Sequence, residues 1–464
     1  MITAAGRTRP ATVVPAWFLL PGLGALLASV VAHVQYQRYF PAAGFDLDIY
    51  RDAVEAFRAG RAVYDLTFAL GLPYTYPPVT LSLLTPLSTL EAAEALPVMT
   101  ALSLTAVFLT VWFVTGLTGY RGIAGRTGVA GAVTGLALWL EPVSSNLSLG
   151  QVNAVLMLLV VADLAAPDRV WLKGAGIGVA TACKLVPGIF VVYLVLTRRL
   201  RAATVAAAAF VLMTIAGCVT APEASDAYWL HGLFLDPSRV AAATGPGFVA
   251  NQSVRGFLLR SCGNTAGAAA MWVLLALAII GAGLTLARLA HRRGEEAVAV
   301  VTVAFTALLV SPVSWSHHWV WVAVLLPVLL DVVLRNDGRV QTVASGLLPA
   351  WTLMLLTWPL PSREDEPPGA NGIIWVAHLQ SQPLHWFGEN MYVLAVVGTM
   401  LLGFRWLRED PDAWSAAWPV QRRETGAFGP TQAASRGSAI TALDTRSGRS
   451  WPARPAGHDP SDAA

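Results

Sequence analysis

Long apolar segments separated by short polar ones run along most of the chain, beginning at residues 15–34. A helix needs about 20 predominantly apolar residues to cross about 30 Å of hydrocarbon. Similar or somewhat shorter segments follow at residues 96–117, 129–140, 151–165, 202–219, 266–289, 297–310, 319–334, 340–361 and 390–407. This pattern predicts an all-α polytopic membrane protein.

One further apolar stretch, residues 170–196, decides the topology because Lys184 and Pro187 interrupt it. Short cytoplasmic loops are enriched in lysine and arginine. If the stretch is a hairpin of two short helices turning at residues 184–187, every tight basic cluster falls on the side of the amino terminus. These clusters contain Arg121 and Arg126; Arg169 and Lys173; Arg198, Arg199 and Arg201; Arg288, Arg292 and Arg293; Arg335 and Arg339; Arg405 and Arg408.

A single span over the same stretch would move the cluster at residues 198–201 to the outside and invert every later loop. We therefore expect about 12 transmembrane helices in the plasma membrane, with both termini cytoplasmic. In this topology residues 1–12 are a cytoplasmic amino terminus and residues 13–407 form the transmembrane domain, whose first outer loop spans residues 35–90. Residues 408–464, rich in Ala, Ser, Arg, Pro and Gly, are expected to be a disordered cytoplasmic tail.

Composition supports the membrane assignment. Of 464 residues, 55% are hydrophobic and 13% charged, whereas soluble domains carry about 25% charged residues. So few charges exclude a set of soluble domains, a disordered chain and a coiled coil, and the net charge of +3 gives no indication of a nucleic-acid partner. The first apolar segment has no A-x-A-like cleavage site, so we expect it to be retained as a span.

The sequence lacks the motifs of several common activities. It contains no Walker A, G-x-G-x-x-G or H-E-x-x-H motif, and its three cysteines show no metal-binding spacing. We therefore expect no cofactor and no metal ion.

Acidic residues follow the first span closely, at Asp46 and Asp48, and an amphipathic stretch continues to Gly60. A carboxylate held just above the membrane beside apolar neighbours is a candidate general base, because a low dielectric raises its pKa. The alternative is that these charges solvate an external loop. Further along the loop, Tyr76 lies in a stiff proline-flanked segment, where it could stack on a sugar ring or anchor at the lipid interface.

Two other predicted outer turns carry polar groups next to apolar helices. Gln151 and Asn153 lie at the mouth of a span, where side-chain amides can donate hydrogen bonds to sugar hydroxyls. Lys184 lies at the tip of the predicted hairpin, where a cation is costly unless it reaches outward or meets an anion such as a phosphate.

The later outer loops add two polar patches. Asn251, Gln252 and Arg255 form one that suits a phosphate or a polyhydroxylated acceptor. His317 and His318 lie in a tight turn between two apolar segments. Adjacent imidazoles on a helix point in different directions, so a role toward a phosphate leaving group is favoured over a metal site, with interfacial anchoring as the alternative.

The topology, fixed by basic residues in other loops, collects these polar groups on one outer face. Independent interfacial residues would not be expected to segregate so completely. A secondary transporter would instead show polar residues near the midplane of the membrane.

These motifs also resemble glycosyltransferase family 87. The likeness is carried in order by D-L-x-I-Y at 46–50, G-x-x-x-Y-D at 60–65, T-Y-P-P at 75–78, G-Q-V-N at 150–153, K-L-x-P at 184–187, N-Q-S at 251–253 and S-P-V-S-W-x-H-H-x-V-W at 311–321. It extends over roughly residues 12–407.

The resemblance implies a GT-C type helical bundle and an enzyme that takes a sugar from polyprenyl phosphate and transfers it to a glycolipid or lipoglycan at the outer leaflet. The family includes α-(1→2)-mannosyltransferases of phosphatidylinositol mannosides and lipomannan, and an arabinofuranosyltransferase. The expected activity is inverting α-(1→2) mannosyl transfer. The alternatives are arabinofuranosyl transfer and, from another class, a transporter or lipid flippase.

Carried over from the family, Asp46 is the expected catalytic base, with Asp48 at a variable position. Residues expected to bind the donor phosphate or sugar are Lys184, Arg255, His317, His318, Asn251 and Gln252. Residues expected to contact the acceptor or a sugar are Tyr76, Gln151, Asn153 and Asp48.

Overall fold

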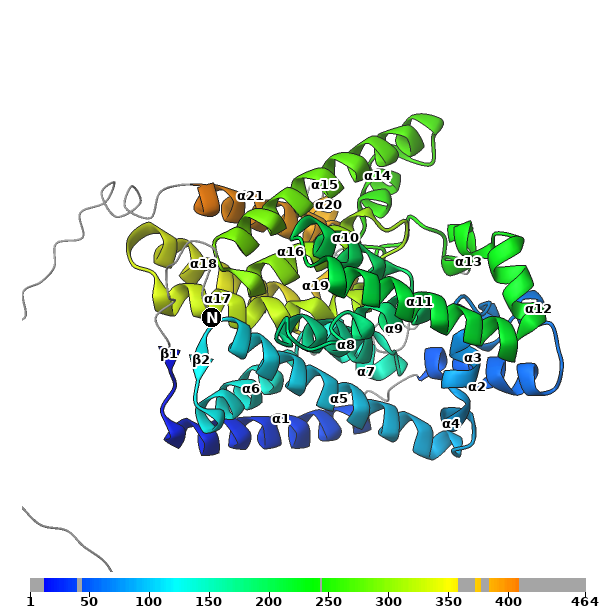
Figure 1. The fold of residues 1–464 in the computed structure, drawn as a ribbon, viewed down its shortest axis with the longest axis horizontal. Helices are drawn as coiled ribbons and strands as arrows, with labels where there is room; N and C mark the ends of the chain where they lie inside the picture. Colours follow the sequence, from blue (N-terminus) through cyan, green and yellow to red (C-terminus); the bar gives the residue numbers. More distant parts are fainter. Residues whose placement is uncertain (1–11, 40–43, 243, 358–371, 377–383, 409–464) are drawn as a thin grey trace, which may run out of the picture. The chain divides into compact units, whose positions relative to one another are not determined.

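The computed structural model describes residues 12–39, 44–242, 244–357, 372–376 and 384–408. All of them belong to one compact unit, Met1–Pro419 (Figure 1). The predicted disordered tail beyond residue 408 and the predicted cytoplasmic amino terminus up to residue 11 lie outside the described residues.

The described residues are mostly helical, with one pair of two-residue strands. The helices of eight or more residues are α1 (Leu19–Tyr39), α2 (Phe45–Arg58), α5 (Ala92–Leu117), α6 (Ile123–Ala137), α7 (Glu141–Leu149), α8 (Asn153–Ala165), α9 (Ala175–Cys183), α10 (Ile189–Leu196), α11 (Leu200–Thr220), α14 (Val254–Cys262), α15 (Ala266–Arg292), α16 (Glu296–Val310), α17 (Val322–Arg335), α18 (Gly338–Leu355) and α21 (Met391–Arg408). The shorter elements include β1 (Thr12–Val13), β2 (Tyr120–Arg121), α3 (Val79–Leu83), α4 (Thr85–Ser88), η4 (Val186–Gly188), α12 (Pro222–Ser225), α13 (Pro237–Val240), η7 (Ser316–Trp321), α19 (Ile373–Val376) and α20 (Leu384–Glu389). Every predicted apolar segment contains a helix, which confirms the all-α polytopic class.

Six helical segments in the described part are long and apolar enough to cross a membrane, or up to seven if the bent pair α7–α8 counts as one span. They are Ala16–Arg38, Ala93–Leu117, Leu200–Thr220, Ala266–Arg292, Ser316–Arg335 and Met391–Arg408. Other predicted spans are present as shorter helices, such as α9 and α10, whose nine and eight residues extend only about 12–14 Å. The expected number of about 12 crossings therefore stays a prediction.

The stretch at 170–196 does break into two short helices at the predicted turn. Gly174 and Gly178, just before and within α9, approach the backbone of Ala202 and Ala206 of α11 in the same order, so these helices run parallel. Because α10 connects the end of α9 to the start of α11, it must run in the opposite direction to both. The tip of this hairpin carries Lys184, and both of its ends lie on the same side.

Close glycine contacts join α1 to α6. Gly131 packs on the backbone of Gly22, and a Cβ there would lie 2.6 Å from the Gly22 carbonyl oxygen. In a membrane the hydrophobic effect does not drive helices together, so their association depends on close packing. Faces of small residues allow this close approach. The strands β1 and β2, which precede α1 and α6, pair in parallel, so the two helices start in the same direction. Figure 1 shows α1 and α6 side by side.

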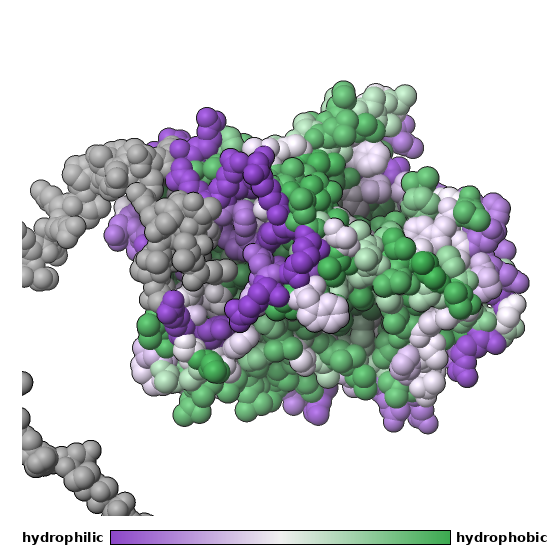
Figure 2. Space-filling view, viewed as in Figure 1, coloured by the Kyte–Doolittle hydropathy of each residue, from purple (hydrophilic) through white to green (hydrophobic). Residues whose placement is uncertain are grey.

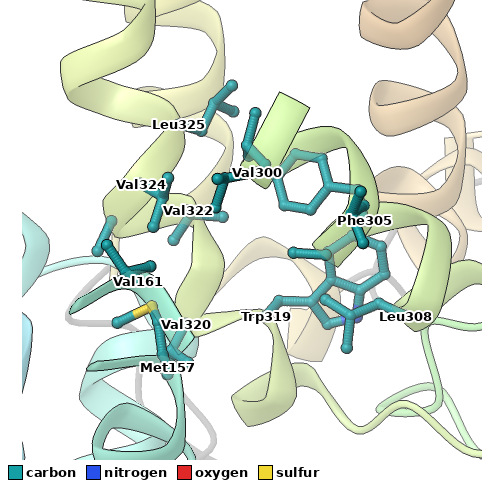
Figure 3. Packing of buried hydrophobic residues seen from close by; sticks show 14 of the residues in the cluster. Met157, Val161, Val300, Phe305, Leu308, Trp319, Val320, Val322, Val324 and Leu325 are labelled. Carbon is teal, nitrogen blue, oxygen red and sulfur yellow. The ribbon is translucent and has the colours of Figure 1, made fainter. Parts of the chain in front are cut away.

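The main apolar core lies where α8, α16 and α17 meet. Figure 3 shows Phe305 and Trp319 packed together beside Met157 and Val161. Large apolar side chains on the outward faces of α1 and α15 remain exposed, and Figure 2 shows them as green surface. Exposed apolar surface of this kind suits contact with lipid chains.

A second, smaller apolar cluster is built from the predicted outer loops. The amphipathic helix α2 buries Leu47, Tyr50 and Val54 on one face, which follows the i, i+3, i+7 spacing of a helix stripe. This face packs against Tyr74 and Tyr228 from the loops that follow α2 and α11. In Figure 1 the helices α2, α3, α4 and α12 gather at one end of the bundle. The packing of α2 fixes where its first turn, with Asp46, can point.

Candidate functional site

A cavity of about 680 Å³ lies between the second apolar cluster and the main core. Its wall is mostly apolar, with a few polar groups that converge on one region, as expected for a ligand site. The predicted site residues among its lining are Asp46, Tyr76, Gln151, Lys184, His317 and His318.

Asp46 enters the cavity from the first turn of α2, directly after Gly44, which adopts the left-handed conformation (φ 62°). Its Oδ2 atom accepts a hydrogen bond of 2.6 Å from Gln151 Nε2. Burial raises the pKa of the Asp46 carboxyl to about 6, although the Gln151 hydrogen bond and the charge of Lys184 both lower it. A carboxylate with this pKa is suited to accept a proton near neutral pH.

Gln151 holds this carboxylate in place. Gly150, with φ 69°, ends α7 and allows a bend of 118° into α8, and a Cβ there would lie 2.7 Å from Leu47 Cβ. Gln151 Oε1 accepts hydrogen bonds from the hydroxyls of Tyr50 (2.8 Å) and Tyr76 (3.0 Å). These two donors fix the amide so that its NH2 group faces Asp46.

Lys184 lies near Asp46 at the hairpin tip. Its Nζ atom is 2.9 Å from Asn153 Oδ1, 3.1 Å from His318 Nε2 and 3.4 Å from the Tyr76 hydroxyl. It forms no ion pair with a carboxylate within the described residues. Burial lowers the pKa of the ammonium to about 8, while Asp46 raises it. Such a cation, surrounded by neutral groups, is well prepared to receive an anion.

The two histidines come from η7 and line the cavity, where His318 lies next to Lys184. Their rings pack edge to face with centroids 4.7 Å apart. His317 Nε2 is buried and has no hydrogen-bond partner in the part of the chain that the structure describes. Because His317 lines the cavity, this nitrogen can bond to a ligand oxygen.

The sequence analysis assigned no site role to two residues of the region, although one of them, Tyr50, lies in the motif at 46–50. Tyr50, which bonds to Gln151 and Tyr76, lies four residues after Asp46 on the same helical face, and this spacing could have revealed it. Glu141 is buried at the start of α7 and accepts hydrogen bonds from Ser316, Trp375 and Tyr392. Since Ser316 precedes the histidines directly, Glu141 helps to hold their turn.

Asn153 does not line the cavity itself but bonds to Lys184 behind it. The structure does not bring four other predicted residues to the cavity: Asp48, Asn251, Gln252 and Arg255.

Each of these four has a physical reason to be elsewhere. Asp48 points to the outside of α2, where its side chain is 50% exposed and lies 3.9 Å from Arg51. Asn251 is fully buried and donates to the carbonyl of Pro312, and Gln252 donates to the carbonyl of Glu389, so both join loops to one another. Arg255 lines a different cavity.

Metal ligands are not gathered at the site. Within the ranges that the structure describes, no group of three or more His, Cys, Asp or Glu side chains could hold a metal ion.

Comparison with known proteins gives one consistent family. The model of glycosyltransferase family 87 matches residues 74–312. A polyprenol-phosphate-mannose-dependent alpha-(1-2)-phosphatidylinositol mannoside mannosyltransferase of Mycobacterium tuberculosis is 32% identical over 400 residues, which cover 82% of this chain and 89% of the relative. The chain belongs to glycosyltransferase family 87. It is therefore a membrane glycosyltransferase.

Other relatives of this glycosyltransferase carry similar names. The protein of the same name from Mycolicibacterium smegmatis is 34% identical over 67% of this chain and 76% of its own length. A polyprenol-phosphate-mannose-dependent alpha-(1-2)-phosphatidylinositol pentamannoside mannosyltransferase of Mycobacterium tuberculosis is 32% identical over 68% of this chain and 72% of its own length. No solved structure matches the chain.

The range matched by the family model contains part of the candidate site. It includes Tyr76, Gln151 and Lys184, begins after Asp46 and ends before the two histidines.

Proposed function

We propose that this glycosyltransferase moves a mannosyl residue from polyprenyl-phosphate mannose to a phosphatidylinositol mannoside, forming an α-(1→2) linkage with inversion. The names of relatives that cover most of the chain support this donor, acceptor and linkage. They favour mannose over arabinofuranose as the donor sugar.

The observation that carries the proposal is the presence of Asp46 and Lys184 in one cavity. A chain of hydrogen bonds links them: Asp46 bonds to Gln151, Gln151 to Tyr76, and Tyr76 to Lys184. Asp46 accepts the proton of an acceptor hydroxyl while the hydroxyl oxygen attacks the anomeric carbon. The bond between that carbon and the lipid phosphate breaks on the opposite face, so a β-linked donor gives an α-linked product.

The bonding electrons leave with the phosphate oxygen. A phosphate is a good leaving group without protonation, so positive charge and hydrogen bonds suffice to stabilise it. Lys184 supplies the charge, and the Nε2 atom of His317, which has no partner among the described residues, supplies a hydrogen-bonding group on the same wall. The aromatic ring of Tyr76, 5.3 Å from Lys184 Nζ, provides a flat surface for a sugar.

The fold is proposed to be a GT-C type bundle of about 12 membrane helices with cytoplasmic termini and the cavity open to the outer face. Contacts among the basic loops support this orientation. β1 pairs with β2, Arg199 is 2.8 Å from Glu296, and Arg335 is 3.0 Å from Glu295. The loops that the positive-inside rule assigns to the cytoplasm thus contact one another, as loops on one side of the membrane can. The orientation can be tested with a reporter that is active only outside the cell, fused after Arg408. Activity of this fusion would contradict the cytoplasmic placement of the carboxyl terminus.

The activity is tested with purified full-length protein reconstituted in liposomes with radiolabelled polyprenyl-phosphate mannose and phosphatidylinositol dimannoside. The expected product is the acceptor extended by one α-mannose, released by an α-(1→2)-specific mannosidase. Parallel reactions contain polyprenyl-phosphate arabinofuranose. Transfer from arabinofuranose alone, or movement of labelled lipid between leaflets without transfer, would overturn the proposal.

A further inference from the structure

A second cavity of about 520 Å³ lies beside the first and shares part of its wall. The residues common to both are Tyr64, Pro73, Arg239 and Ala241. The second cavity is more polar, and its charged lining residues are Asp65, Arg239 and Arg255. Two arginines against one carboxylate leave it with a net positive lining.

Arg255 is the unusual member of this lining. It lies in the first turn of α14, and its guanidinium packs 5.5 Å from the ring centroid of Trp272. Its Nη1 atom is buried and has no hydrogen-bond partner among the described residues. A guanidinium remains charged in proteins, and a buried donor left unpaired costs free energy unless an acceptor binds it.

Arg239 approaches the same cavity from α13. It donates one hydrogen bond of 2.7 Å to the carbonyl of Tyr64, which fixes its position in the wall between the two cavities. The pair therefore offers two cations from different outer segments, one of them with an unused buried donor. Arginine is the side chain best suited to bond two oxygens of one phosphate.

We propose that this second cavity binds the phosphodiester of the glycolipid acceptor, with Arg255 and Arg239 as its ligands. The proposal rests on the proposed function, because only an acceptor built on a phospholipid carries this group. Sugar hydroxyls next to the phosphodiester then face Asp65, whose carboxylate can accept their hydrogen bonds.

The chemistry of inversion requires separate places for the two lipid phosphates. The donor phosphate leaves from one face of the anomeric carbon, and the acceptor hydroxyl attacks from the other. The acceptor's own phosphate is separated from that hydroxyl by at least one sugar ring, so it cannot share the Lys184 position. Adjoining cavities with separate cations meet this requirement, and the shared wall allows the acceptor sugar to reach Asp46.

The test compares wild type with Arg255→Gln and Arg239→Gln in the reconstituted transfer assay, using two acceptors. One is phosphatidylinositol dimannoside, and the other is octyl α-mannoside, which has no phosphate. With the phospholipid acceptor, Arg255→Gln is expected to raise the acceptor KM about tenfold, with kcat and the donor KM unchanged. With octyl α-mannoside the variant is expected to match wild type, which also shows that it is folded.

Two controls accompany these variants. Arg255→Lys keeps a charge and should recover part of the lost affinity. Arg61→Gln removes an exposed arginine of the first outer loop and should change neither KM.

Each other outcome has a distinct meaning. A rise in the donor KM of Arg255→Gln would assign the cavity to the donor phosphate and overturn the proposal. An equal loss with both acceptors, or no loss with either, would also overturn it. If wild type transfers mannose to neither acceptor, the proposed function is wrong. This result differs from those that overturn only the cavity proposal, in which wild type is active.

Discussion

Two buried polar clusters lie at opposite ends of α16 and use similar residues differently. At its amino-terminal end, Glu296 accepts hydrogen bonds from Arg199 (2.8 Å), His291 (2.6 Å) and Tyr193 (3.0 Å). At the other end, beyond Ser311, lies the cavity with Asp46, whose one hydrogen-bond donor among the described residues is Gln151.

The difference lies in what faces each carboxylate. Both oxygens of Glu296 meet protein donors, including a permanent cation, so this carboxylate is satisfied without a ligand. Asp46 has a neutral partner, and the nearby cation, Lys184, bonds to neutral groups instead of to the carboxylate. An acid and a cation that pair with each other leave no charge free for a ligand, whereas a separated acid and cation that share a cavity can act on a substrate placed between them.

The largest expected effect comes from Asp46→Asn. The amide keeps the size of the side chain but cannot accept a proton, so kcat should fall about a thousandfold. Transfer in reconstituted liposomes measures it. The matched control is Asp48→Asn, two residues away on the exposed side of α2, which should retain activity within about twofold. Full activity of Asp46→Asn, or an equal loss in both variants, would contradict the role of Asp46.

Lys184→Met is expected to follow, with a loss in kcat of about a hundredfold. Removing one preorganised group that stabilises a developing negative charge typically has an effect of this size. Arg288 provides a control outside the cavity, and Arg288→Met should leave kcat unchanged. A loss confined to KM would show that Lys184 binds the donor equally in its ground and transition states, and the proposed role in leaving-group departure would be wrong.

A smaller effect is expected for Gln151→Met, and it appears in the pH dependence. A general base acts only when deprotonated, so with Asp46 in its proposed role the kcat/KM of wild type should rise with pH and level off above about 6. The Gln151 hydrogen bond favours the ionised form and lowers this pKa. Its loss, at about 1.5 kcal/mol for a hydrogen bond to a charged group, should move the rising limb about one pH unit upward.

A purely structural role for Gln151 would reduce kcat/KM equally at every pH. The exposed Gln341 gives the control, since Gln341→Met should leave the limb at the wild-type position.

Most of the helical architecture could be predicted from the sequence, because hydropathy alone determines where helices can lie in a membrane. The hairpin at Lys184 was also predictable, since positive charge in the flanking loops required the chain to return. The sharp bend at Gly150 was not, because a left-handed glycine (φ 69°) depends on the close approach of α2 and not on local composition.

The site was predictable only to the level of a membrane face. Topology grouped Asp46, Gln151 and Lys184 on one side, and the structure brings these three together. It grouped Asn251 and Arg255 on the same side as well, yet their side chains point into a loop junction and a second cavity. The direction of a side chain depends on how the outer loops pack, and an apolar pattern carries no information about that.

The smallest expected effect on catalysis belongs to Glu296→Gln, at the other end of α16. The amide leaves the guanidinium of Arg199 without its counter-charge in a site where both side chains are only 11% exposed. Breaking a buried pair in this way costs about 3 kcal/mol, so the thermal midpoint in detergent should fall by several degrees. The exposed Glu223 gives the control, because Glu223→Gln should leave the midpoint unchanged. Neither Glu296 nor Arg199 lines the cavity that holds Asp46. For the folded protein, kcat and both KM values should therefore stay within about twofold of wild type, and the rising pH limb should not move. A loss of kcat at an unchanged midpoint would mean that the Glu296 cluster acts on the reaction, and the separation between a structural and a catalytic end of α16 would not hold.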